Sequence, residues 1–373
     1  MAANVSTRVI SRHTQAIRMR FDVRANNLNA WCRLPGNPFA AGLTLMPNAP
    51  QQAPVAVSFG PLLFPDEIDT LTCLLYTQAA REHPNRVSAV AEILSGEEIL
   101  DRAEATLGWQ GDAVLSLNLK PTAGGHSQLR LGVDLETDTG DDVFPGVSLC
   151  YLLAYANNPL AELCNAVGSD KGTEHGIGAG VPHCYALEYF NLFSAFREDS
   201  FSLLEIGLQN SGAKRTAPDD VPSLRVWHDF FPSARCFGYD IIDFSRFAGD
   251  RMVTFQGDQG SRRDLGRFLE THDWPLFRVV IDDGSHASSD QQVSLGTLFP
   301  RVQQGGLYII EDLNWQPYPE SQTTLETLRA YLEGGRISSP HLSEGEARYL
   351  QDHIESVQIL RPNDAELAVL RKR

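Results

Sequence analysis

Two stretches of this sequence decide its fold: FRVVIDDGSH at Phe277–His286 and GGLYIIEDL at Gly305–Leu313. In each stretch a short apolar run leads directly into acidic residues, which is typical of a buried strand that ends at a polar edge. The first strand ends at Asp282–Asp283 and the second at Glu311–Asp312. Ligands of an open α/β sheet bind beyond the carboxyl ends of its parallel strands, so we expect these carboxylates to meet around one point.

The acidic residues at these strand ends form a candidate metal site. Carboxylate oxygens suit a hard divalent cation, and Asp283, Glu311 and Asp312 would supply them. His286 follows the first candidate ligand by three residues and could act as a base beside the metal. Simpler roles stay open at this point, because Asp282 and Asp283 could cap the following turn and helix, and the other two acids could be solvated loop residues.

Length and charge narrow the class of protein. A chain of 373 residues is long enough for two domains. The formal net charge of −16 argues against sequence-independent binding to nucleic acid or to an anionic membrane surface. No apolar run approaches the ~20 residues that span a bilayer, and the N-terminus lacks the apolar core of a secretion signal. We therefore expect a cytoplasmic protein with no nucleic-acid or membrane partner.

The cysteines point to the same compartment. They are widely spaced and form no CxxC pair, a pattern that favours buried thiols in a reducing cytosol over disulfides or a zinc site. The six residues are Cys32, Cys73, Cys150, Cys164, Cys184 and Cys236.

Residues 1–162 are predicted to form an auxiliary α+β domain. Helical periodicity predicts three helices, at Leu62–Glu82, Val87–Leu107 and Val147–Tyr155. Four other runs are expected to be strands, at Arg18–Val23, Val55–Phe59, Val114–Leu119 and Leu129–Leu135. The last two should pair with each other through the turn at Pro121–Ser127.

Residues 163–373 alternate between strand and helix patterns, which predicts a parallel sheet. The expected strands are Ser202–Gly207, Arg235–Asp240, Met252–Gln256, Arg278–Asp282 and Leu307–Glu311. The expected helices are Val221–Phe231, Arg262–Thr271, Ser289–Phe299 and a stretch near Leu325–Leu332. Two last apolar runs, His353–Leu360 and Glu366–Leu370, could pair with each other.

The ends of the first three strands indicate a nucleoside cofactor. The first strand runs into Gly207, where backbone can approach a ligand closely. The second ends at Asp240, and an acid at that position commonly accepts hydrogen bonds from a ribose, although a helix N-cap is the alternative. The third is followed by Asp258 and Gln259, which could meet an adenine edge. The absence of a GxGxxG motif argues against NAD.

The series LEIG, GYD, GDQ, IDDGSH and IIEDL, preceded by SDKGTEH at Ser169–His175, resembles class I S-adenosylmethionine-dependent methyltransferases. More narrowly, it is similar to the metal-dependent O-methyltransferases that modify deoxysugars and rhamnose on natural products. The resemblance covers roughly Ser169–Trp315. It implies a Rossmann-like α/β domain with a mainly parallel seven-stranded sheet, preceded by an auxiliary domain.

The resemblance also implies roles for individual residues. The positions expected near S-adenosylmethionine are Asp170, Lys171, Gly172 and Thr173 at its methionine end, Glu205 and Gly207 in the first loop, Asp240 at the ribose, Asp258 and Gln259 at the adenine, and Asp282 beside them. The expected Mg²⁺ ligands are Asp283, Glu311 and Asp312, with His286 as general base. Side chains alternate along a strand, so only one of Asp282 and Asp283 should face the site, and the motif favours Asp283. His175, Tyr185 and Tyr189 have no aligned role.

The implied reaction is methyl transfer from S-adenosylmethionine to a sugar hydroxyl of a small-molecule glycoside. Two alternatives stay open: a catechol-like phenol as acceptor, or a cofactor-binding scaffold without activity. Trp315 and Tyr318 follow the metal motif and could wall the acceptor site or belong to an ordinary loop. The resemblance further implies a homo-oligomer, with a tetramer as one form.

Overall fold

The computed structural model describes residues 14–15, 43–45, 55–62, 68–78, 85–120, 127–136, 146–174, 182–208, 220–270, 276–363 and 365–373. The chain divides into two compact units. One contains Ala166–Lys171 and His183–Arg373, and the other contains Arg12–Asn165 and Gly172–Pro182. The domain boundary expected between residues 162 and 163 falls inside helix α1 (Pro159–Ala166). The strand expected at Arg18–Val23, His175 and residues 209–219 of the first cofactor loop lie outside the described residues.

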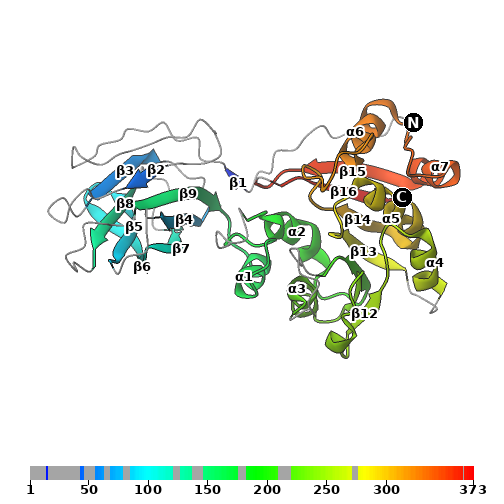
Figure 1. Cartoon of the computed structure of the whole chain (residues 1–373), viewed down its shortest axis with the longest axis horizontal. Helices are drawn as coiled ribbons and strands as arrows, with labels where there is room; N and C mark the ends of the chain where they lie inside the picture. Colours follow the sequence, from blue (N-terminus) through cyan, green and yellow to red (C-terminus); the bar gives the residue numbers. More distant parts are fainter. Residues whose placement is uncertain are drawn as a thin grey trace. The chain divides into compact units, whose positions relative to one another are not determined.

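The first unit is built on a seven-stranded sheet in the order β12-β11-β10-β13-β14-β16-β15 (Figure 1). Its strands are β10 (Ser202–Ile206), β11 (Arg235–Asp240), β12 (Met252–Gln256), β13 (Phe277–Asp282), β14 (Val302–Ile310), β15 (Ile354–Leu360) and β16 (Leu367–Lys372). Strands β10 to β14 run parallel, and β16 runs antiparallel to both of its neighbours. The strand numbering reverses direction between β10 and β13, which is where an open α/β sheet binds its ligand.

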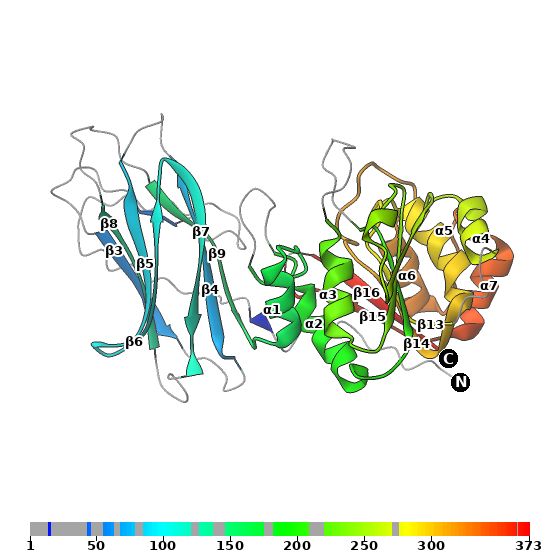
Figure 2. The same ribbon diagram turned by 90° about the horizontal axis from the view of Figure 1, so that it is seen from below.

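Helices cover both faces of this sheet, with α3 on one side and α4, α5 and α7 on the other (Figure 2). The helices are α2 (Tyr185–Phe193), α3 (Pro222–Phe230), α4 (Arg262–Glu270), α5 (Ser288–Leu298), α6 (Thr324–Gly334) and α7 (Glu344–His353). Short 3-10 turns occupy Ser194–Phe196, Ser245–Phe247 and Phe299–Arg301.

Alternation along the strands divides the core of this unit into two layers. Leu204, Phe237, Val280 and Tyr308 are buried in one cluster with the apolar residues of α4 and α5. On the opposite layer, α2 and α3 pack through aromatic rings, and Trp227 meets Tyr189 edge-on at 5.3 Å between ring centroids. A strand buried on both faces reads as a continuous apolar run, which explains the run in FRVVI.

The α/β fold class expected for this part of the chain is confirmed. All five predicted strands and all four predicted helices are present, and β15 and β16 pair as expected. Helix α7 is not among the predicted elements, although Ser343 and Glu346 form a capping box at its start, with Ser343 Oγ accepting from the Glu346 amide. None of the described helices has the length and apolar character needed to cross a membrane.

The second unit contains two β-sheets that face each other (Figure 2). One has the order β1-β9-β4-β7, with β2 also paired to β9, and the other has the order β3-β8-β5-β6. The strands are β1 (Thr14–Gln15), β2 (Leu43–Leu45), β3 (Val55–Leu62), β4 (Thr70–Gln78), β5 (Val87–Ser95), β6 (Glu98–Leu107), β7 (Gln110–Asn118), β8 (Ser127–Leu135) and β9 (Gly146–Tyr155). Buried residues of both sheets form one core, as in a β-sandwich.

The three helices predicted in this unit are wrong, because the described residues of each region form strands. In β4, both Leu74 and its neighbour Leu75 are buried, so the apolar residues fall at helical as well as alternate spacing. The stretch Val87–Leu107 is a hairpin whose two strands join at Gly96, which has a φ of +63°. The sequence prediction does not recognise this turn, so it takes the two strands for one long helix.

The strands expected at Val114–Leu119 and Leu129–Leu135 are present, but they do not pair with each other. Strand β7 pairs with β4, and β8 pairs with β3 and β5 in the other sheet. The expected pairing is therefore wrong, since the two strands belong to different sheets. The cysteine side chains that are described are buried, as expected; they are Cys73, Cys164, Cys184 and Cys236.

Candidate active site

The site lies at the carboxyl ends of β10, β13 and β14. Gly207 follows β10 with a φ of +82°, and a Cβ atom there would lie 1.9 Å from the main-chain oxygen of Asp283. The backbone continues the sheet contacts past the strand ends, because the Asp283 amide donates to Ile206 at 2.9 Å and the Glu311 amide to Asp282 at 2.9 Å. Only glycine permits this approach, so Gly207 brings the first and fourth strand ends together.

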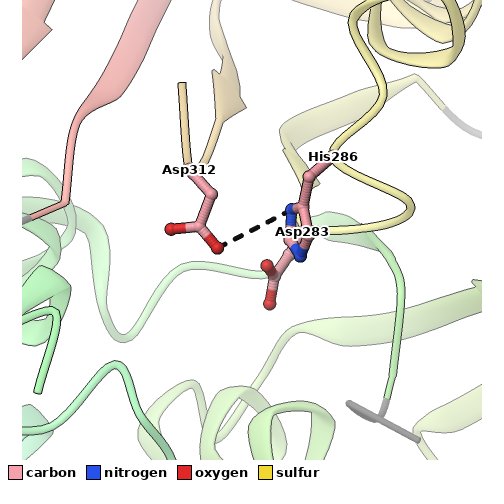
Figure 3. Close-up of side chains that lie close together, drawn as sticks. All are labelled: Asp283, His286 and Asp312. Atoms are coloured by element: carbon pink, nitrogen blue, oxygen red, sulfur yellow. Dashed lines mark ion pairs between the residues drawn. The ribbon is translucent and has the colours of Figure 1, made fainter. Parts of the chain in front are cut away.

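Asp283, His286 and Asp312 form a group at these strand ends. One ligand atom from each lies within 4.8 Å of the other two, and all three side chains are partly buried. Figure 3 shows the Asp312 carboxylate directed at the His286 ring, with Asp283 beside that ring. The distance from His286 Nδ1 to Asp312 Oδ2 is 3.6 Å. Nδ1 is buried and makes no hydrogen bond of ordinary length among the described residues, and the Asp312 carboxylate is the charged group that faces it.

The backbone of this group is strained. His286 has a φ of +57° and Asp312 a φ of +54°, and Cys184 at the start of α2 has a φ of +61°. No other non-glycine residue among those described has a positive φ. Residues other than glycine adopt this conformation at a cost and are concentrated at functional sites. The strain therefore supports a functional role for the turn after β13 and the turn after β14.

Glu311 has a different environment from its neighbour Asp312. It is 1% exposed, and its Oε2 accepts from Lys171 Nζ at 2.7 Å. Its Oε1 accepts from the Tyr189 hydroxyl, and the same Lys171 ammonium also donates to Asp283 Oδ2. Lys171 is itself 1% exposed. Lys171 thus bridges Asp283 and Glu311, two of the three predicted metal ligands. The sequence predicts this lysine beside the cofactor instead.

Electrostatics keep Lys171 charged. Burial acts to lower the pKa of Lys171, but the negative charges of Asp283 and Glu311, with those of Asp170 and Glu205, outweigh it and raise the pKa well above the ordinary value. A buried ammonium needs such partners because an unpaired charge is very costly inside a protein.

Asp312 is held from the other side by α2 and the residues before it. Its Oδ1 accepts from the Tyr185 hydroxyl at 2.7 Å and lies 3.4 Å from His183 Nδ1. Tyr185 and Tyr189 are one helical turn apart on α2, so they reach the consecutive acids Asp312 and Glu311. The sequence leaves these tyrosines without an aligned role in the site and favours core packing for most of the aromatic set they belong to, and His183 is absent from the prediction. The helical spacing of the tyrosines is visible in the sequence, but the partner of each hydroxyl is not.

Asp282 faces the opposite layer from Asp283. It is fully buried, its Oδ1 accepts from Gln259 Nε2 at 2.5 Å, and its Oδ2 accepts from Ser294 and, at 3.2 Å, from Tyr308. Burial raises the pKa of Asp282 to about 6, although these hydrogen bonds oppose the rise. Gln259 also accepts from the Ser285 amide at 2.9 Å, so Asp282 and Gln259 hold the turn that carries His286.

The other predicted cofactor residues lie at the neighbouring strand ends. Asp240 is buried, and its two oxygens accept from the amides of Leu208 and Ile242 at 2.8 Å each. Burial raises the pKa of Glu205 to about 7, while the charge of Lys171 opposes this rise. Asp258 is exposed beyond β12. Each carboxylate oxygen of Asp240 still has a lone pair for a further donor such as a ribose hydroxyl.

The SDKGT stretch divides between the two units. Asp170 and Lys171 belong to the α/β unit, and the Asp170 carbonyl accepts from the His183 amide at 2.9 Å. Gly172 and Thr173 belong to the β-sandwich unit, where the Thr173 hydroxyl donates to the Tyr155 hydroxyl at 2.9 Å.

The loop at residues 314–322 provides an exposed aromatic ring beside His286. Trp315 is 53% exposed and meets the His286 ring edge-on at 5.4 Å between centroids. The loop is fastened to the start of α5, because the Ser288 hydroxyl donates to Gln316 at 2.9 Å and the Ser289 amide donates to Glu320 at 2.8 Å. The indole therefore has a fixed position next to the candidate base.

The donor set fits a hard divalent cation in part. Asp283 and Asp312 present carboxylate oxygens to one point, as such an ion requires. Glu311 is not in this group among the described residues, and both of its oxygens accept hydrogen bonds, from Lys171 and from Tyr189. Asp283 and Asp312 are thus the residues that could hold the ion, with His286 beside it.

Comparisons with known proteins point to one chemistry. The chain is 36% identical over 151 residues to the 8-demethyl-8-(2-methoxy-alpha-L-rhamnosyl)-tetracenomycin-C 3'-O-methyltransferase of Streptomyces olivaceus, which covers 40% of this chain and 37% of that protein. It is 37% identical over 139 residues to the mycinamicin VI 2''-O-methyltransferase of Micromonospora griseorubida, which covers 37% of this chain and 33% of that protein.

A third relative is the 8-demethyl-8-alpha-L-rhamnosyl tetracenomycin-C 2'-O-methyltransferase of Streptomyces olivaceus, 37% identical over 187 residues, covering 48% of this chain and 45% of that protein. A solved structure of MycE methyltransferase in complex with Mg, SAH and mycinamycin VI is 28% identical, covers 58% of this chain and 55% of that chain, and has a TM-score of 0.45. No protein-family model matches the chain.

In these three relatives the match spans less than half of the relative's length. All three are named O-methyltransferases, which confirms the resemblance drawn from the strand-end motifs.

Proposed function

We propose that this chain is a Mg²⁺-dependent O-methyltransferase that transfers the methyl group of S-adenosylmethionine to a sugar hydroxyl of a glycosylated natural product. The observation that carries the proposal is the convergence of Asp283, His286 and Asp312 at the carboxyl ends of the parallel strands. Similarity to the tetracenomycin and mycinamicin O-methyltransferases supports the acceptor class.

The chain's own residues would prepare the acceptor hydroxyl. A sugar alcohol is a poor nucleophile while it keeps its proton, so a base must remove that proton as the methyl group arrives. In the proposal His286 is that base. A proton on its Nδ1 faces Asp312 at 3.6 Å and leaves Nε2 to accept the acceptor's proton. Trp315 shields one edge of the ring and offers a flat surface to the acceptor.

Asp283 and Asp312 are the proposed holders of the cation. When bound there, Mg²⁺ would lower the pKa of a coordinated hydroxyl and fix its direction. Tyr185 holds the Asp312 carboxylate, and Lys171 holds that of Asp283. The role of Glu311 as a third ligand stays a prediction.

S-adenosylmethionine is proposed to bind over Gly207 and beside Asp240 and Asp258. The Asp240 carboxylate would accept from the ribose hydroxyls, and the glycine turn at Gly207 would present backbone to the cofactor. Asp282 and Gln259 would act indirectly, because their side chains bind each other and the turn before His286.

The test measures methyl transfer from labelled S-adenosylmethionine to a rhamnoside and to a catechol. We expect transfer to the rhamnoside, loss of it after treatment with EDTA, and recovery on addition of Mg²⁺. Transfer that survives exhaustive chelation would contradict the metal role, and a faster reaction with the catechol would contradict the acceptor class.

Replacing the proposed base gives a sharper measurement. His286→Gln is expected to lower the transfer rate by about 100-fold or more while the calorimetric affinity for S-adenosylmethionine stays close to that of the wild type. His228→Gln is the matched control, since His228 lies on α3 beside Asp229 and Arg251. A His286→Gln rate equal to that of the control would refute the base assignment.

A further inference from the structure

Lys171 contacts two of the predicted metal ligands, which its expected place beside the cofactor does not explain. Its ammonium donates to Asp283 Oδ2 and, at 2.7 Å, to Glu311 Oε2. Lys171 is separated in the sequence from Asp283 by 112 positions and from Glu311 by 140 positions. The lysine and Glu311 are each 1% exposed, so solvent screens their interaction very little.

The charge around this lysine is unbalanced. Asp283 and Glu311 contact it directly, and Asp170 and Glu205 act on it electrostatically. One ammonium is therefore in contact with two carboxyl groups, and two more act on its charge at an edge of the sheet. Such a cluster needs further positive charge or protons, and an ammonium already within it repels any second cation at short range.

We propose that Lys171 is a positioning residue whose ammonium acts as the standing counter-ion of Asp283 and Glu311, holding both carboxylates in place and opposing the divalent cation that binds beside them. This inference rests on the proposed cation site, but it needs neither the sugar acceptor nor methyl transfer. Tyr189 completes the arrangement by donating to the second oxygen of Glu311. The lysine would thus lower the site's affinity for a divalent ion while keeping the metal-free site ordered.

The experiment compares Lys171→Met with Lys372→Met in the full chain. Lys372 is a matched control because it is also buried, but its ammonium donates to the carbonyls of Phe299, Pro300 and Val302 at 3.3, 2.9 and 2.7 Å. In EDTA, both variants should melt at lower temperature than the wild type, with a loss of roughly 10 °C for Lys171→Met.

Binding of Mn²⁺, followed by calorimetry, separates the two lysines. Lys171→Met should bind Mn²⁺ at least about fivefold more tightly than the wild type, because a repelling charge is gone. Lys372→Met should bind it unchanged. Equal or weaker Mn²⁺ binding by Lys171→Met would overturn the proposal. No Mn²⁺ binding by the wild type would instead refute the proposed metal-dependent function, and the next variant would still decide the role of Lys171.

That variant is the double substitution Lys171→Met with Glu311→Gln, which also covers the case in which Lys171→Met does not fold. Removing both charges should give a melting temperature in EDTA closer to that of Glu311→Gln alone than the sum of the two single losses predicts, since the buried Glu311 carboxylate is gone and only the partly exposed Asp283 lacks its counter-ion. Additive losses in the double variant would show that Lys171 and Glu311 are not coupled and would overturn the counter-ion role.

Discussion

Gly207 shows how one residue sets the geometry of the site. Its φ of +82° belongs to the region that other residues avoid, and a Cβ atom would collide with the backbone of Asp283 and Gly284. The two strand ends can meet only because this side chain is absent. The position therefore combines a conformational requirement with a steric one.

We expect Gly207→Ala to lower the free energy of unfolding by roughly 3 kcal/mol or more, from the backbone strain plus the overlap. Urea denaturation measures this loss. Gly305→Ala is the control, because Gly305 has a φ of +73° but nothing lies within 4 Å of the point that a Cβ atom would occupy. The control should lose only about 1 kcal/mol. Equal losses would mean that the contact with Asp283 carries no weight.

Single residues also show what can and cannot be predicted from the sequence. Alternation along a strand predicted that one of two adjacent aspartates would face the site, and the two side chains do lie in different layers. The bridge from Lys171 to Asp283 and Glu311 could not be predicted in this way. It joins segments distant in sequence, and no local pattern of spacing records such a contact.

At the scale of elements, the start of α7 is joined to the start of α4. Arg262 is the first residue of α4, and its guanidinium donates to both carboxylate oxygens of Glu346 at 2.9 and 2.8 Å. Burial acts to raise the pKa of Glu346, but hydrogen bonds from Arg262 and Ser343 outweigh it and hold the pKa below the ordinary value of 4.5. The charged form of Glu346 therefore stabilises the fold.

We expect Glu346→Gln to lower the free energy of unfolding at pH 7 by about 1 kcal/mol, since a two-bond arginine contact and part of a cap weaken. A carboxyl whose pKa is lower when folded stabilises above its unfolded pKa and loses that contribution as the pH falls through its folded pKa. The difference between variant and wild type should accordingly shrink below about pH 4.5. Urea titrations between pH 7 and pH 4 measure it.

Glu326→Gln is the control for this pair. Glu326 holds the same capping-box position in α6, where its carboxylate accepts from the Thr323 amide at 2.8 Å. Among the described contacts it accepts no hydrogen bond from an arginine. Its substitution should cost less than that of Glu346, and a larger cost would assign the effect to capping alone.

Elements were predictable where one pattern excluded the others. In the α/β unit, strands such as β10 and β13 are short apolar runs followed by glycine or acidic residues, and helices such as α4 bury residues at helical spacing, so the two patterns identify different segments. In the β-sandwich, β4 buries Leu74 as well as the alternate residues Leu71, Cys73 and Leu75. This burial of both faces gives a strand the spacing of a helix, and tertiary packing then decides between them.

At the scale of the whole molecule, each of the two units has a buried hydrophobic cluster of its own among the residues that the structure describes. One contains Leu131 of β8 and its neighbours in the sandwich, and the other contains Leu204 of β10 and its neighbours around the seven-stranded sheet. Units with their own cores can unfold as separate cooperative steps. We therefore expect two transitions in differential scanning calorimetry.

Matched core substitutions assign the two transitions. Leu131 is 2% exposed and Leu204 is 0% exposed, and Leu→Ala at such sites costs about 2–5 kcal/mol. Leu131→Ala should lower one midpoint and Leu204→Ala the other. S-adenosylmethionine binds the folded α/β unit in the proposed function, so it should raise only the midpoint that Leu204→Ala lowers. A single transition whose midpoint temperature falls in both variants would mean that the two units unfold together. S-adenosylmethionine would then raise that one midpoint.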